Sequence, residues 1–281
     1  MRCLASLLLV VSTAFWGDRL PAQTEEVSAS YSLESSALSQ HEPVIVRFDV
    51  RNEAMQPITL RLGRDRKENF SFLIQWPDGS KHERPPSPRR DGAFDPGNVD
   101  LGPGERLRHQ LLLNEWAVFP GPGEYEIEVQ LLAPIELRSG EKVLSKPYHT
   151  RFKVLPLDEA QLRAACERLV QQIEGTFVVR DLHGAASALA HVDDPIVVPY
   201  LERALQSGKY VEQPIIEGLT RMGSEAAAQV LMAVVKESPA WPPSQDTMAG
   251  TRATLAWQAL HTIAATTSNE RLKQEILRSV P

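Results

Sequence analysis

Apolar and polar residues alternate in the first half of the chain and follow a longer period in the second. From Val44 to Val50 the apolar side chains return at every second position, which predicts a strand with one face in a core. The pattern recurs at residues 58–62, 70–76, 107–113, 125–131 and 148–154, with turn residues such as Pro77-Asp78-Gly79 between several segments. Six or seven short strands without intervening helices predict an antiparallel β-sandwich over residues 24–156.

After Pro156 the apolar period becomes 3.6 residues, which predicts helices. Asp158 is a candidate N-cap for a first helix that ends at Gly175. Its predicted apolar stripe comprises Leu162, Ala165, Cys166, Leu169, Val170 and Ile173. We therefore expect Cys166 to be a small core residue rather than a reactive thiol.

Four apolar positions, spaced by three, nine and four residues, recur three times in the second half. The copies are Leu189, Val192, Leu201 and Leu205; Leu219, Met222, Leu231 and Val235; and Leu260, Ile263, Leu272 and Ile276. The turn in each copy has a cap candidate: Asp194, Ser224 or Asn269. This pattern predicts an α-helical solenoid of HEAT-like repeats over residues 157–281.

Two irregular segments are candidates for partner binding. The last repeat interval is longer because of an insertion from Ser238 to Gly250, in which Trp241 stands between prolines. Trp241 either fills the end of the stack or contacts a partner, and the partner alternative predicts a binding surface that includes this insertion. The stretch from Lys81 to Gly104, predicted as one long loop, holds Arg89 and Arg90 and is either a partner-binding loop or a solvated insertion.

The first half resembles bacterial extracytoplasmic immunoglobulin-like domains. The residues on which this rests are 42–52, 57–60, 101–105 and 121–129. The nearest comparison is the small β-sandwich family of the intracellular proteinase inhibitors. Tyr125 is similar to the tyrosine corner of such folds, in which the hydroxyl bonds to a nearby backbone group. The resemblance implies an immunoglobulin-like fold, and no inhibitory loop matches residue by residue.

Residues 1–23 have the pattern of a secretory signal peptide. Arg2 precedes an apolar run from Leu4 to Trp16, and a small residue, Ala22, stands near the expected cleavage point. The run is shorter than the roughly 20 apolar residues that a membrane span needs. We expect an exported protein, periplasmic or secreted and of bacterial origin, with no membrane span after cleavage.

Charge and cysteine content narrow the classes of partner. The chain has a formal net charge of −6, and loss of residues 1–23 makes it more acidic. An acidic chain is a poor candidate for nucleic-acid binding, which depends on basic phosphate contacts. Since Cys3 leaves with the signal, only Cys166 remains and no internal disulfide is expected.

No motif of a known catalytic, cofactor or metal site stands in the sequence. The histidines are scattered, and His183 and His191 lack a close third ligand. We therefore expect no enzyme, no cofactor and no metal, and a noncatalytic adaptor or scaffold that binds a protein through its sandwich and helical surface. The alternative is a proteinase-inhibitor-like module that acts through residues 81–104.

Overall fold

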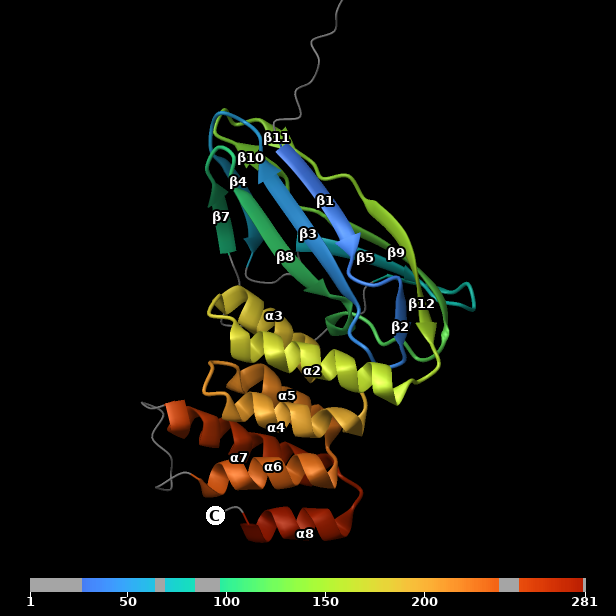
Figure 1. The fold of residues 1–281 in the computed structure, drawn as a ribbon, viewed down its shortest axis with the longest axis vertical. Coiled ribbons are helices and arrows are strands. Elements are labelled where there is room, and N and C mark those ends of the chain that lie inside the picture. Colours follow the sequence, from blue (N-terminus) through green and yellow to red (C-terminus); the bar gives the residue numbers. More distant parts are fainter. Residues whose placement is uncertain (1–26, 64–68, 84–96, 238–247, 280–281) are drawn as a thin grey trace, which may run out of the picture.

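The protein has a β-rich N-terminal region followed by a helical C-terminal region (Figure 1). The structure, a computed structural model, describes residues 27–63, 69–83, 97–237 and 248–279. Arg89, Arg90 and Trp241 lie outside these ranges. Within them, no helix combines the length and the apolar content needed to cross a bilayer.

Twelve strands in the described residues form three sheets. The strands are β1 (Val27–Leu33), β2 (Ala37–Ser39), β3 (Ile45–Asn52), β4 (Ile58–Gly63), β5 (Phe70–Gln75), β6 (Lys81–Glu83), β7 (Gly97–Leu101), β8 (Arg106–Leu112), β9 (Gly123–Leu131), β10 (Ile135–Leu137), β11 (Lys142–Val143) and β12 (Tyr148–Leu155). The sheets have the orders β1-β3-β8, β11-β10-β4-β7 and β2-β12-β9-β5-β6. Pairing is antiparallel except between β2 and β12.

The inward faces of the three sheets enclose one hydrophobic core. Along β9, Tyr125, Ile127, Val129 and Leu131 are buried while the residues between them are partly exposed, as period two requires. The predicted tyrosine corner is present, because the Tyr125 hydroxyl donates to the backbone oxygen of Gly121 at 2.7 Å. This bond fixes the approach of the chain to β9.

The structure corrects the prediction that Lys81 to Gly104 is one structureless loop. Residues 81–83 form β6 on the edge of β5, and residues 97–101 form β7 on the edge of β4. Both strands are short and rich in polar residues, so their own sequences do not show period two strongly. Pairing with a longer strand is what orders them.

The helical region contains seven α-helices within the described residues. They are α2 (Glu159–Gly175), α3 (Val179–Ala190), α4 (Val198–Gln206), α5 (Glu212–Met222), α6 (Glu225–Lys236), α7 (Met248–Thr266) and α8 (Glu270–Ser279); short 3-10 helices η1 (Leu113–Glu115) and η2 (Pro195–Val197) accompany them. In α2, Asp158 caps the backbone N–H groups of Ala160 and Gln161, and the predicted stripe is the set of buried residues. The first predicted helix is confirmed.

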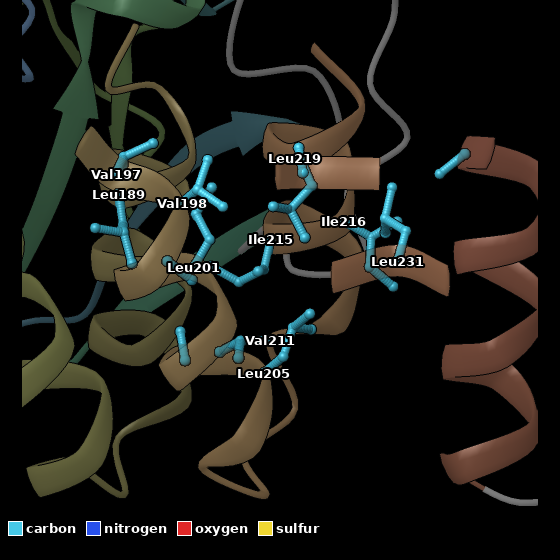
Figure 2. Close-up of a cluster of buried hydrophobic side chains, with 14 of the residues drawn as sticks. Leu189, Val197, Val198, Leu201, Leu205, Val211, Ile215, Ile216, Leu219 and Leu231 are labelled. Atoms are coloured by element: carbon cyan, nitrogen blue, oxygen red, sulfur yellow. The ribbon is translucent and has the colours of Figure 1, made fainter. Parts of the chain in front are cut away.

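Each helix packs against the next helix in the chain and against the one after it. The side chains of α4, α5 and their neighbours meet in a common hydrophobic interior (Figure 2). Of the apolar positions that recur in the three sequence copies, all except the half-buried Met222 are buried. The helices α4, α5 and α6 are therefore each held by helices on both sides.

The two regions share a hydrophobic contact. Ile45 and Leu112, at one end of β3 and β8, belong to the same buried cluster as the helices. Helix α3 packs on β8, which is an edge strand: Arg180 donates to the backbone oxygen of Arg108 at 3.1 Å. Covering an edge strand with a helix protects its unpaired backbone groups.

A polar contact holds the start of α2 against the β-rich region. The Ser39 hydroxyl accepts a hydrogen bond from the backbone N–H of Asp158 at 2.8 Å, and the Glu42 carboxylate accepts one from the Ser39 N–H at 3.1 Å. Glu42 is buried, and this desolvation raises the pKa of its carboxyl above its ordinary value, against the lowering effects of the Ser39 N–H, Gln161 and Arg168.

We expect the stability of Glu42→Gln, compared with that of the native chain at the same pH, to increase as the pH rises. The folded state holds the Glu42 proton more tightly than the unfolded chain, so this group stabilises the fold fully below about pH 4, and the contribution is lost as the pH rises through the raised folded pKa. Glutamine keeps a hydrogen-bond acceptor for Ser39 and does not titrate. The melting temperature of the variant minus that of the native chain should be larger at about pH 7 than at about pH 4. An equal pH dependence of the two would contradict the burial of a titrating carboxyl here.

The boundary near residues 155–158 stays a prediction. Pro156, Leu157 and Asp158 are exposed, so limited proteolysis is expected to yield a fragment that begins close to Leu157. Cleavage confined to the segment between β6 and β7, with the two halves never separated, would show that the shared contact dominates the behaviour of the regions.

Candidate partner-binding edge

The turns on one edge of the helix stack are closed by side-chain caps. Asp194 accepts from the N–H of Ile196 at 2.9 Å, Ser224 from Ala227 at 3.2 Å and Asn269 from Leu272 at 3.1 Å. All three caps were predicted from the sequence and are confirmed. The connections α3 to α4, α5 to α6 and α7 to α8, which hold these caps, lie on the same side of the stack (Figure 1).

The opposite edge carries exposed apolar side chains. It is formed by the connection from α2 to α3, with Phe177, Val178 and Val179, and by the connection from α4 to α5, with Tyr210 (Figure 1). Phe177 is 88% exposed and Tyr210 is 69% exposed, and both valines are exposed as well. The N-cap positions of α3 and α5 are Val178 and Val211, and neither provides a side-chain cap. Apolar residues therefore stand where the other edge has polar caps.

Lys209 connects the two loops of this edge. Its Nζ atom lies 3.7 Å from the centroid of the Phe177 ring and 3.3 Å from the backbone oxygen of Thr176. A cation over an aromatic face is attracted by the quadrupole of the ring. Hereafter the aromatic edge means Phe177, Val178, Val179, Lys209 and Tyr210.

The sequence contains a signal for this edge that periodicity does not reveal. Gly175 ends α2, and three bulky apolar residues follow at positions 177–179 before the next amphipathic stripe begins. Apolar residues beyond a helix stop either enter the core or face solvent, and only the packing of α2 against α3 decides between them. Trp241, the aromatic residue predicted as an anchor, lies outside the described residues.

Two other kinds of chemical site are relevant to the described residues: a reactive thiol and a metal-binding cluster. Cys166 is buried, and desolvation raises the pKa of its thiol to about 12, which makes it unreactive at neutral pH. Within the ranges that the structure describes, no three His, Cys, Asp or Glu side chains are grouped to hold a metal ion.

The outer face of β5, β6, β9 and β12 has a shallow hollow of about 350 Å³. Its charged side chains pair across the strands: Arg151 with Glu126, and His149 Nδ1 with Glu128 at 3.5 Å. Such cross-strand pairs are common on a solvated sheet face. They leave the aromatic edge as the better candidate for binding.

No protein-family model and no curated protein matches the chain. Solved structures resemble it only weakly. A CARDB domain from Pyrococcus furiosus, solved with di-metal ions, is 11% identical and has a TM-score of 0.25; the match covers 47% of this chain and 94% of that one.

Two further similar structures are enzymes. A β-glucosidase from Erythrobacter marinus is 17% identical over 46% of this chain and 16% of that one, with a TM-score of 0.26. The alkylpurine DNA glycosylase AlkC of Pseudomonas fluorescens is 12% identical over 46% and 30%, with a TM-score of 0.23.

These neighbours overturn the prediction that the chain is not an enzyme. That prediction was wrong, because it took the absence of a recognisable motif as evidence against catalysis, and the structures that the chain weakly resembles include β-glucosidases and a DNA glycosylase. Catalytic groups can also come from positions far apart in a sequence, where motif searches do not find them. At these identities and TM-scores the matches assign no activity to this chain.

Proposed function

We propose that the chain is an exported adaptor that binds a protein partner through the aromatic edge. In this proposal the β-rich region is an immunoglobulin-like sandwich and the helices are HEAT-like repeats, which commonly present extended binding surfaces. The observation that supports it best is the exposure of Phe177 and Tyr210 on neighbouring loops. Aromatic side chains are enriched among the residues that dominate binding energy at interfaces.

The edge is suited to binding because its geometry is set in advance. Phe177 follows a helix that is capped by Asp158, and Lys209 holds the Phe177 ring from the neighbouring loop. A side chain that is already ordered loses less conformational entropy when a partner arrives. Phe177 and Tyr210 have few contacts to lose within the chain, so truncating them costs little stability.

We expect Phe177→Ala and Tyr210→Ala each to weaken peptide binding by at least tenfold. The probe is a phage-displayed library of random dodecapeptides selected on the purified chain, with the leading peptides synthesised and their dissociation constants measured by fluorescence anisotropy. Loss of a central aromatic anchor is worth about 2 kcal/mol or more, and about 1.4 kcal/mol is tenfold. Melting temperatures should stay close to the native value.

The matched control is Met55→Ala, which removes a side chain that is 94% exposed on the β-rich region. It should bind every selected peptide as the native chain does. If the library yields no binder, or if the binders tolerate both aromatic substitutions, the proposed function is wrong. The proteinase-inhibitor-like alternative rests on Arg89 and Arg90, outside the described residues, and stays a prediction.

A further inference from the structure

We infer that the segment which docks on the aromatic edge is acidic as well as apolar: an aliphatic or aromatic side chain lies against Phe177 and Tyr210, and an Asp or Glu carboxylate beside it pairs with Lys209. This inference rests on the proposed function and adds the chemistry of the partner. Its basis is the position of the Lys209 ammonium group on the aromatic edge and the way the neighbouring charged side chains are paired.

The ammonium group of Lys209 is placed within the apolar surface rather than at its margin. It stands over the Phe177 ring at 3.7 Å while also donating to the Thr176 backbone oxygen at 3.3 Å. Both partners are uncharged, so the full positive charge remains to attract an anion. Fixing a lysine side chain usually costs rotamer entropy on binding, and here the two contacts hold it beforehand.

No carboxylate in the described part of the chain forms an ion pair with Lys209. The nearest acid at the end of α2, Glu174, is bound by the guanidinium of Arg203 at 2.6 Å, which also holds Glu167. At the start of α5, burial raises the pKa of the Glu212 carboxyl above its ordinary value, against the lowering effect of nearby Arg252. Neither Glu174 nor Glu212 forms an ion pair with Lys209 among the described residues.

A second cation extends the positive charge along α3. Arg180 follows directly after Val179, is exposed, and donates to the backbone oxygen of Arg108 at 3.1 Å without an ion pair among the described residues. Asp181 stands in the first turn of α3, where a negative charge stabilises the helix dipole. The unpaired positive charges therefore lie beside exposed apolar side chains.

The net charge of the chain makes this local charge selective. At −6 the protein repels an acidic segment over most of its surface, and the aromatic edge is a place where apolar contact and charge attraction coincide. The same net charge opposes adsorption to an anionic lipid surface. A peptide segment fits these observations better than a membrane.

The test uses the dodecapeptides selected on the native chain, together with versions in which each Asp or Glu is replaced by Asn or Gln. Lys209→Met removes the charge and keeps an unbranched stem on the Phe177 ring. Lys153→Met is the control, because it makes the same change in net charge at an exposed position of β12. Neither lysine is part of a hydrophobic core.

We expect selected peptides to carry an acidic residue within about two positions of an apolar anchor. Lys209→Met should weaken their binding about two- to fivefold, the range of an exposed ion pair, and Lys153→Met should not. The neutral peptide versions should bind the native chain and Lys209→Met equally. The difference should shrink in concentrated salt, which screens exposed charges.

Two results would overturn the inference in different ways. Binders without acidic enrichment, lost in Phe177→Ala and unaffected by Lys209→Met, would remove the acidic partner and leave the proposed function intact. The second result is failure to select any peptide, together with Phe177-dependent sedimentation of the chain on phosphatidylglycerol vesicles. It would overturn both the proposed function and the acidic peptide partner, and it would show that the aromatic edge binds a membrane surface.

Discussion

Replacing Leu231 with aspartate is expected to unfold the helical region. Leu231 on α6 and Leu201 on α4 are fully buried in the interior shared by neighbouring helices (Figure 2). A carboxylate in such a place has no cation or hydrogen-bond donor, so its burial costs several kcal/mol, comparable to the total stability of a small domain. Leu201→Asp should have the same effect, because each helix depends on the helices that pack against it.

Far-ultraviolet circular dichroism during thermal unfolding measures this result. The matched control is Gln229→Asp, which places the same carboxylate on the exposed side of α6, two residues before Leu231. Its helical signal and melting temperature should be nearly native. An unchanged melt in Leu231→Asp or Leu201→Asp would mean that the corresponding leucine does not hold the stack together.

Gly218→Ala is expected to destabilise the protein by about 2 to 3 kcal/mol, although alanine is the better helix former by about 1 kcal/mol. A β-carbon at position 218 on α5 would lie 2.9 Å from both Cα and Cβ of Ala190, at the end of α3. Backbone atoms cannot move aside as a side chain can, so the two helices would have to separate. Separation opens the interior that both helices line.

The comparison variant is Gly184→Ala, also within a helix. Its β-carbon would meet Oε1 of Gln110 at 2.6 Å, the far end of a flexible side chain that can rotate away. This variant should remain within about 1 kcal/mol of the native free energy of unfolding in urea, or exceed it. If both alanine variants unfold at the same urea concentration as the native chain, close approach of α5 to α3 is not what requires Gly218.

Local patterns predicted the elements that depend on neighbours in sequence. The stripe of α2 matched its buried residues, and the Asp194, Ser224 and Asn269 caps formed as expected, because a cap acts within three residues of itself. The Tyr125 hydroxyl likewise reaches only four residues back. Interactions between residues this close in the sequence are determined almost entirely by the local order of the residues.

Elements that depend on distant partners were missed or misassigned. The strands β6 and β7 are ordered by β5 and β4, and their polar sequences gave no period of their own. The exclusion of an enzyme failed for a related reason, because the absence of a contiguous motif does not describe what distant residues do together. The candidate edge was also missed, since Lys209 and Phe177 stand far apart in sequence and meet only through adjacent loops.

By itself the sequence determined where the chain changes from period two to period 3.6, which side chains face inward along the elements with a clear apolar period, and where several helices begin. These properties follow from backbone geometry and from hydrogen bonds to residues a few positions away. Only the tertiary structure decided that Ile45 and Leu112 complete the helical interior, that Glu42 is buried against α2, and that Phe177 remains in solvent. Burial is a property of the packed molecule, because it depends on which surfaces meet after the elements have formed.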